Sequence, residues 1–215
     1  MPQTTTSREG IDFRTGQSIT DVLLERIHAD PAATLMLRPS APGEWREVSG
    51  QEFLDDVSSV AKGLLAAGLE PGGRIALFGA TAYEWTLCDY AIWFAGGVSV
   101  PFYDSSSADQ LAWMITDAEV SFALVQSDDH ALRARAGAQE AGIPAGTVPV
   151  WVYEAAGLDE LREMGAAITD EELEARRAQV TGESVATPIY TPGTTGRSKG
   201  CVLTHGNFVE TVASA

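Results

Sequence analysis

Short apolar segments alternate with helix-forming segments through the middle of this chain, and this alternation restricts the possible folds more than any other feature. Strands are predicted over residues 74–78, 98–101, 121–125 and 148–153, with stretches between them that are long enough to form helices. Parallel strands need crossovers of this length, whereas antiparallel strands need only short turns. The sequence therefore predicts an α/β fold with a mostly parallel sheet flanked by helices.

The remaining predicted elements surround this sheet. Strands over 34–38 and 44–48 are separated by a turn-rich segment and predict a small N-terminal hairpin. Residues 1–17 are polar and are expected to be loose. Helices are predicted after the cap Thr20 and up to Pro31, after the capping box Ser49-x-x-Glu52, over 82–95, after the cap Ser107, over 128–141, over 170–179 as a charged and exposed helix, and from Thr204 or His205 onward.

Large aromatic residues recur at helical spacing within Thr81–Gly97. Such a stripe most often packs into a hydrophobic core, which is the preferred interpretation here. A pocket for an acyl chain is the alternative.

The most chemically specific segment is YTPGTTGRSKG, Tyr190–Gly200, which follows a strand predicted over 186–191. Its glycines let the backbone approach a ligand closely, and successive free N–H groups in such a turn can bind an anion. Hydroxyl groups and the charge of Lys199 add further donors, so the segment suits a polyphosphate. Its spacing matches neither the GxxxxGK[ST] phosphate loop nor the GxGxxG dinucleotide motif.

The segment resembles the phosphate-loop signature of the adenylate-forming superfamily, [ST]-[ST]-G-[ST]-[ST]-G-x-P-K-G. Two positions depart from it: Pro192 stands where a small hydroxyl residue is usual, and Ser198 stands where proline is usual. Residues 98–125 also resemble this superfamily, and the pattern from Tyr103 to Trp113 is most similar to long-chain fatty acyl-CoA synthetases. The residues that match the loop signature are Thr191, Gly193, Thr194, Thr195, Gly196, Lys199 and Gly200.

The resemblance implies an enzyme that uses ATP to convert a carboxylic acid, here a long-chain fatty acid, to an acyl-adenylate and then to a coenzyme A thioester. It assigns the loop to the β- and γ-phosphates and Lys199 to catalysis as a mobile positive charge. Thr191 is expected to meet Mg²⁺ and phosphate. Thr194 and Thr195 would donate hydroxyls, and Gly193 and Gly196 would allow close approach of the backbone.

The resemblance also implies that residues 18–215 are the N-terminal part of an adenylation domain that stops soon after the loop, without the mobile C-terminal domain. We therefore expect no adenylate or thioester formation by this chain alone. Two alternatives remain open: an adenylation domain for an amino or aryl acid, and a non-catalytic nucleotide-binding or interaction fragment. An incomplete sheet would expose apolar edges, so self-association is also expected.

Composition and charge limit the partners, metal sites and cellular location that are expected for this chain. The 215 residues carry a net charge of −16, which disfavours binding to nucleic acid. The two cysteines, Cys88 and Cys201, lie far apart and predict no disulfide framework, so a cytoplasmic location is expected. The three histidines lack metal-ligand spacing, and no apolar run is long enough for a transmembrane helix.

Overall fold

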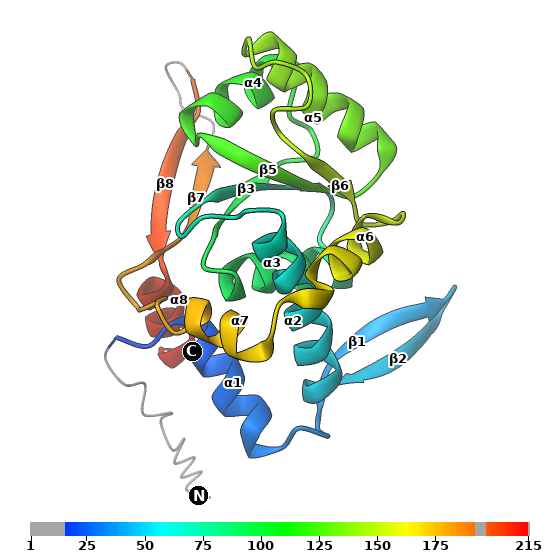
Figure 1. Cartoon of the computed structure of the whole chain (residues 1–215), viewed down its shortest axis with the longest axis vertical. Coiled ribbons are helices and arrows are strands. Elements are labelled where there is room, and N and C mark those ends of the chain that lie inside the picture. The colour runs from blue at the N-terminus through cyan, green and yellow to red at the C-terminus, as the bar shows by residue number, and fades with distance from the viewer. Residues whose placement is uncertain (1–15, 192–196, 215) are drawn as a thin grey trace, which may run out of the picture.

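A parallel sheet of four strands forms the centre of the protein in a computed structural model that describes residues 16–191 and 197–214 (Figure 1). Its strands are β3 (Arg74–Phe78), β4 (Val98–Phe102), β5 (Val120–Val125) and β6 (Val150–Val152), in the spatial order β4-β3-β5-β6. All neighbouring pairs are parallel, as the strand–helix alternation predicts. The predicted fold class is therefore confirmed.

Helices cover both faces of this sheet. Helices α2 (Gly50–Ala66), α3 (Tyr83–Phe94) and α6 (Gly157–Met164) pack on one face, while α4 (Ala108–Asp117) and α5 (Asp128–Glu140) pack on the other. Because side chains alternate along a strand, β3 divides its residues between two cores. Ile75 and Leu77 point into the core on the side of α2, α3 and α6. Ala76 and Phe78 point into the core on the side of α4 and α5.

Two glycines allow close contacts between helices within these layers. A Cβ at Gly137 of α5 would lie 2.7 Å from the Leu111 Cβ of α4, so a side chain at this position would separate the helices. A Cβ at Gly63 of α2 would collide with the backbone of Leu161 in α6. Close packing of α4 on α5, and of α6 on α2, therefore depends on these positions.

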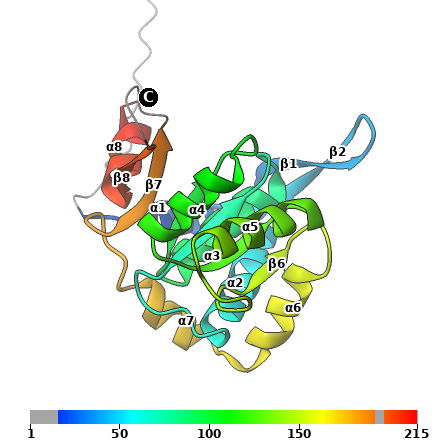
Figure 2. The same cartoon turned by 90° about the horizontal axis from the view of Figure 1, so that it is seen from above.

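The predicted N-terminal hairpin is present and projects from the body of the protein (Figure 2). It comprises β1 (Thr34–Ala41) and β2 (Glu44–Ser49), joined by a tight turn in which Gly43 has a φ of +80°. Gly43 can adopt this backbone conformation without the steric penalty that a side chain would bring.

Two helix starts differ in detail from the sequence prediction. Helix α1 (Ile19–Ala29) is capped by Ser18 rather than Thr20, through a reciprocal capping box with Asp21. Ser49 accepts the backbone N–H of Glu52 at the start of α2 as expected. The Glu52 carboxylate, however, pairs with an arginine of β2 and does not complete the second half of the box.

The predicted charged helix is partly buried. Helix α7 (Asp170–Arg177) buries Leu173 and Arg177, and Arg177 forms 2.6 Å ion pairs with Asp21 of α1 and Glu174 of its own helix. The expectation of an exposed helix is therefore confirmed for five of its eight residues but not for Leu173 and Arg177, because a long-range ion pair attaches α7 to α1. Helix α6 and the short 3₁₀ helix Gly165–Ala167 were not predicted from the sequence; α6 begins without a capping side chain.

The C-terminal strands lie outside the parallel sheet. Strands β7 (Val185–Thr191) and β8 (Lys199–Thr204) pair antiparallel in a two-stranded sheet of their own, followed by α8 (His205–Ala213). The parallel pairing expected for the strands of the α/β core does not extend to these two. A connection as short as residues 192–198 joins antiparallel strands but is too short for a parallel crossover. In both views this hairpin and the β1–β2 hairpin lie on opposite sides of the molecule (Figures 1 and 2).

Within the described ranges, no helix is both long enough and apolar enough to cross a bilayer. The two cysteines are free thiols, with Cys88 buried and Cys201 exposed. The aromatic residues of α3 pack in the core: Tyr83, Trp93 and Phe94 are buried, in agreement with the core interpretation of this stripe.

Candidate functional site around the β7–β8 loop

The two ends of the predicted phosphate loop lie directly opposite each other. Thr191 is the last residue of β7, Lys199 is the first residue of β8, and the two are paired across the hairpin. Directly opposed residues of an antiparallel pair project their side chains to the same face. The structure therefore brings together two of the predicted site residues. The other four, Gly193, Thr194, Thr195 and Gly196, lie outside the described residues.

Near the loop, one face of the β7–β8 hairpin packs against α4 and the other face is exposed to solvent. Tyr190 is buried, and its hydroxyl donates a 2.6 Å hydrogen bond to Oδ2 of Asp117 at the end of α4. Burial, together with this acceptor, raises the pKa of Tyr190 well above its usual value. Because side chains alternate along a strand, Thr191 and Lys199 lie on the face opposite Tyr190, and both are exposed. The two polar side chains are therefore accessible to a ligand.

Helix α4 also holds the segment that leaves the loop. The indole Nε1 of Trp113 donates a 2.9 Å hydrogen bond to the backbone carbonyl of Ser198. The guanidinium carbon of Arg197 lies 4.7 Å from the centre of the same indole ring, a cation–π geometry. These two contacts attach residues 197–198 to α4 and place Lys199 immediately beyond the attachment.

A cavity of about 380 Å³ lies at the base of the loop. It is next to the carboxyl end of β4 and the N-terminus of α4, where α/β sheets usually bind ligands and where a helix favours anions. Ser107 caps this helix and Gln110 completes the capping box. The lining residues are Tyr103, Ser105, Ser106, Gln110, Met114, Tyr190 and Ser198.

Except for Tyr190 and Ser198, the sequence analysis did not place the residues that line this cavity at the site. Most of them fall within the pattern from Tyr103 to Trp113, which had served only to support the resemblance. Trp113 and Ser198 are separated by 85 residues in the sequence. The signal that could have identified them is the combination of polar residues after a predicted strand with a helix cap.

Ionic contacts hold the segment after β4 against α5. Oδ1 of Asp104 lies 2.9 Å from Nε2 of His130, and the other ring nitrogen of His130 lies 2.7 Å from the Ser127 hydroxyl. Arg133 donates to Asp104 and to the carbonyl of Ser106. The hydrogen bond from His130, aided by Arg133, lowers the pKa of Asp104 below its ordinary value. This wall of the cavity is therefore fixed by contacts with α5.

His205 lies away from the loop, at the opposite end of β8. It is fully buried at the start of α8, with its ring 5.6 Å from the Trp93 ring between centroids. Neither ring nitrogen has a hydrogen-bond partner among the described residues. Burial lowers the pKa of His205 to about 4, so the ring is neutral at pH 7. This placement gives His205 a packing role at the start of α8, against the Trp93 ring.

Residues 24–215 match the family described as AMP-binding enzyme. The chain belongs to the AMP-binding enzyme family. The superfamily resemblance in the sequence is thus confirmed over most of the chain.

Relatives in this family are considerably longer than this chain. A protein named long-chain-fatty-acid–CoA ligase FadD15 from Mycobacterium tuberculosis is 38% identical over 180 residues, which cover 80% of this chain and 29% of the relative. The crystal structure of VinN superimposes with a TM-score of 0.74 at 23% identity, covering 94% of this chain and 50% of VinN. ATP-bound MatB from Rhodopseudomonas palustris superimposes with a TM-score of 0.66 at 26% identity, covering 88% of this chain and 36% of MatB. The matched part of the chain therefore spans between 29% and 50% of the length of these relatives.

Proposed function

We propose that this chain is the N-terminal, phosphate-binding part of an ATP-dependent acyl-CoA ligase that activates a long-chain fatty acid. The observation that carries the proposal is the pairing of Thr191 with Lys199 across the hairpin, beside a polar cavity at the carboxyl end of β4. The ligase family and the name of the FadD15 relative support the reaction and the acid.

In the proposed complex, the loop holds the β- and γ-phosphates of ATP, the part that leaves as pyrophosphate. Gly193 and Gly196 allow the backbone to approach the phosphates, and Thr194 and Thr195 donate hydroxyls. Lys199 neutralises charge that develops on the leaving group, which is the main contribution a protein makes to such a reaction. The contacts of Trp113 with Ser198 and Arg197 keep Lys199 at the mouth of the loop.

Mg²⁺ and coenzyme A belong to the same proposal. Mg²⁺ usually binds to one or two protein groups, several waters and the phosphates of the substrate. The exposed hydroxyl of Thr191 fits the position of one such ligand, with nucleotide oxygens and water as the others. Coenzyme A would accept the acyl group in the complete enzyme. A cytoplasmic location, where ATP and coenzyme A are available, is also part of the proposal.

The chain contains two lysines, which makes a matched test possible. Lys199→Ala removes the proposed phosphate ligand, whereas Lys62→Ala removes the same charge from an ion pair with Asp170 on another part of the surface. Calorimetric titration with Mg·ATP should show affinity falling about 10- to 100-fold for Lys199→Ala, because a charged hydrogen bond contributes ~1.5–3 kcal/mol. The Lys62→Ala affinity should stay within about twofold of the parent.

Equal ATP affinities for the two variants would exclude Lys199 from the site. An ATP affinity that is undetectable in the parent chain, with a normal melting curve, would contradict the proposal as a whole and favour the interaction-fragment alternative. A second titration tests which class of carboxylic acid is bound. Palmitate, an aromatic acid and an amino acid are each added to the chain in the presence of ATP. Only palmitate should increase the apparent affinity for ATP.

A further inference from the structure

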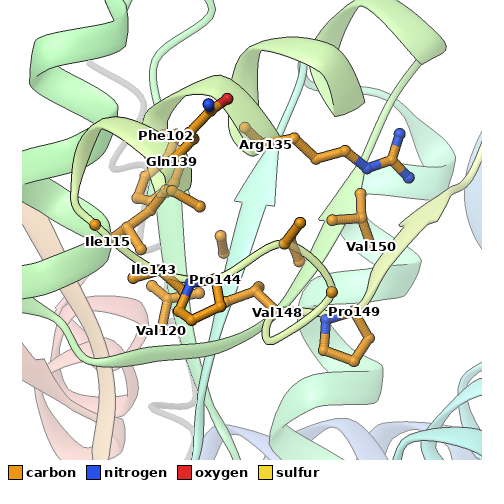
Figure 3. Close-up of a pocket in the computed structure, with 17 residues that line it drawn as sticks. Phe102, Ile115, Val120, Arg135, Gln139, Ile143, Pro144, Val148, Pro149 and Val150 are labelled. Atoms are coloured by element: carbon orange, nitrogen blue, oxygen red, sulfur yellow. The ribbon is translucent and has the colours of Figure 1, made fainter.

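A second cavity of the described residues lies away from the phosphate loop. It has a volume of about 570 Å³, within the range of small-molecule pockets. It lies between α5, the sheet and the connection that leads into β6, and Figure 3 shows mostly apolar side chains around it. No residue lines both this cavity and the polar cavity beside the loop.

Small side chains on two facing elements leave this space open. The sheet contributes Ala76 and Ala123, and α5 contributes Ala134 and Ala138. Larger apolar residues form the remaining walls, among them Phe102 and those that Figure 3 labels as Ile115, Val120, Ile143 and Val148. These apolar walls can remove an alkyl chain from water.

The polar side chains of the lining are restricted to one helix. Arg135 and Gln139 lie one turn apart on α5, both are exposed, and Figure 3 shows their polar ends at the periphery of the cavity. Six of the ten arginines that the structure describes pair with a carboxylate, as Arg133 does with Asp104. Arg135 has no ion pair with another described residue. Its guanidinium is thus a positive charge beside an apolar cavity, available to an anionic group.

We propose that this cavity binds a single-chain anionic amphiphile, with the alkyl tail inside it and a carboxylate head on Arg135. The apolar lining accounts for the tail, and the charge of Arg135 accounts for the head. This inference does not depend on the proposed ATP site, because the two cavities have separate linings.

A chain-length series tests whether the alkyl tail enters the cavity. The protein is titrated with sodium hexanoate, octanoate and decanoate, each below its micelle-forming concentration. Affinity should rise about 3- to 4-fold for each added methylene that enters the cavity, the factor expected for burial of one CH₂ group. Equal affinities for the three acids would overturn the proposal, and this measurement needs no variant.

Two arginine variants test whether the carboxylate head binds to Arg135. Arg135→Gln should weaken decanoate binding about 5- to 10-fold and leave the binding of decanol unchanged. The matched control is Arg26→Gln, which removes the same charge at an exposed position of α1 and should leave both ligands unaffected. Equal decanoate affinities for the two variants would overturn the assignment of the head.

Filling the cavity tests its position. Ala138→Leu places a larger side chain in the wall, so both decanoate and decanol should lose affinity while the far-ultraviolet circular dichroism spectrum is retained. Undiminished binding by a folded Ala138→Leu variant would place the ligand elsewhere. Lys199→Ala should retain decanoate binding, which separates failure of this inference from failure of the proposed ATP site.

Discussion

The central sheet and the C-terminal hairpin differ in how completely their strands are covered. In β3 all residues except Arg74 are buried, and in β5 all except Ser121 are buried. In β8, by contrast, no residue is buried, and Val202 is 58% exposed. Helices pack on both faces of the sheet, whereas in the hairpin only β7 packs into the body and β8 is its exposed strand.

This difference in burial suggests that the sheet mainly stabilises the fold, whereas the hairpin mainly presents the ligand-binding residues. The sheet and the helices that pack on it contain most of the buried apolar residues, and burial of apolar surface is the main driving force for folding. The hairpin leaves Thr191 and Lys199 accessible, as a ligand-binding loop on a rigid scaffold requires. If this division is correct, changes in the sheet should alter folding, and changes at the loop should alter ligand binding with little effect on folding.

The largest expected effect is in the sheet. Leu77→Ala removes a fully buried side chain and should lower the free energy of unfolding by ~3–4 kcal/mol, through lost burial and the cavity left behind. Val202→Ala in the hairpin should change it by less than ~0.5 kcal/mol. Urea denaturation of both variants measures this difference. Similar losses would show that the hairpin is as tightly packed as the sheet.

The next effect concerns pH on the hairpin side. His205 has its pKa lowered to about 4 by burial, so between pH 6.5 and about 4 the unfolded chain binds a proton that the folded protein does not. Stability should therefore fall as the pH decreases through this window, by up to ~3 kcal/mol. His205→Phe should remove this loss. Denaturation midpoints of both proteins at pH 7 and pH 4.5 provide the measurement.

A partly buried carboxyl on the sheet side should give the opposite slope. Burial raises the pKa of Asp89, in α3, to about 7. Because the unfolded carboxyl ionises near pH 4, stability should fall as the pH increases from about 4 to 7. Asp89→Asn should remove that fall and leave the acid-side loss due to His205 in place. The same slope in Asp89→Asn as in the parent would assign the effect to another group.

A smaller effect is expected where the hairpin contacts α4. Tyr190→Phe removes the hydrogen bond to Asp117 and should cost ~1–2 kcal/mol, because the acceptor is a carboxylate and the hydrogen bond is partly buried. Tyr103→Phe is the matched control, since Tyr103 is 52% exposed and its hydroxyl bonds to no other described residue. Thermal unfolding should separate the two variants by several degrees.

The smallest expected effect on folding is at Trp113. Trp113→Phe keeps an aromatic ring near Arg197 but removes the hydrogen bond to Ser198, so the loop loses one attachment. We expect a 2- to 5-fold loss of ATP affinity, equivalent to ~0.5–1 kcal/mol, with an almost unchanged melting temperature. Trp45→Phe, at an exposed position of β2, is the control. A large fall in melting temperature would indicate a structural role instead.

Much of the fold could be predicted from the sequence because the signals are local. β3 has the predicted bounds, and β4 and β5 each differ from theirs by one residue. The missed helix α6 starts at Gly157 without a capping side chain, so it lacked the local signal that identified α4 through Ser107. The expected self-association remains a prediction. Exposed apolar side chains such as Val202 are compatible with it.

The sequence by itself determined the alternation of strands and helices, the family, and the residues at the two ends of the loop. Only the tertiary structure decided that β7 pairs with β8 outside the parallel sheet, and that Trp113 meets Ser198. It also decided that small side chains of α5 and the sheet face each other across a cavity. Periodicity, caps and glycine-rich turns act over a few residues. Contacts between residues far apart in the sequence depend instead on how all the layers pack together.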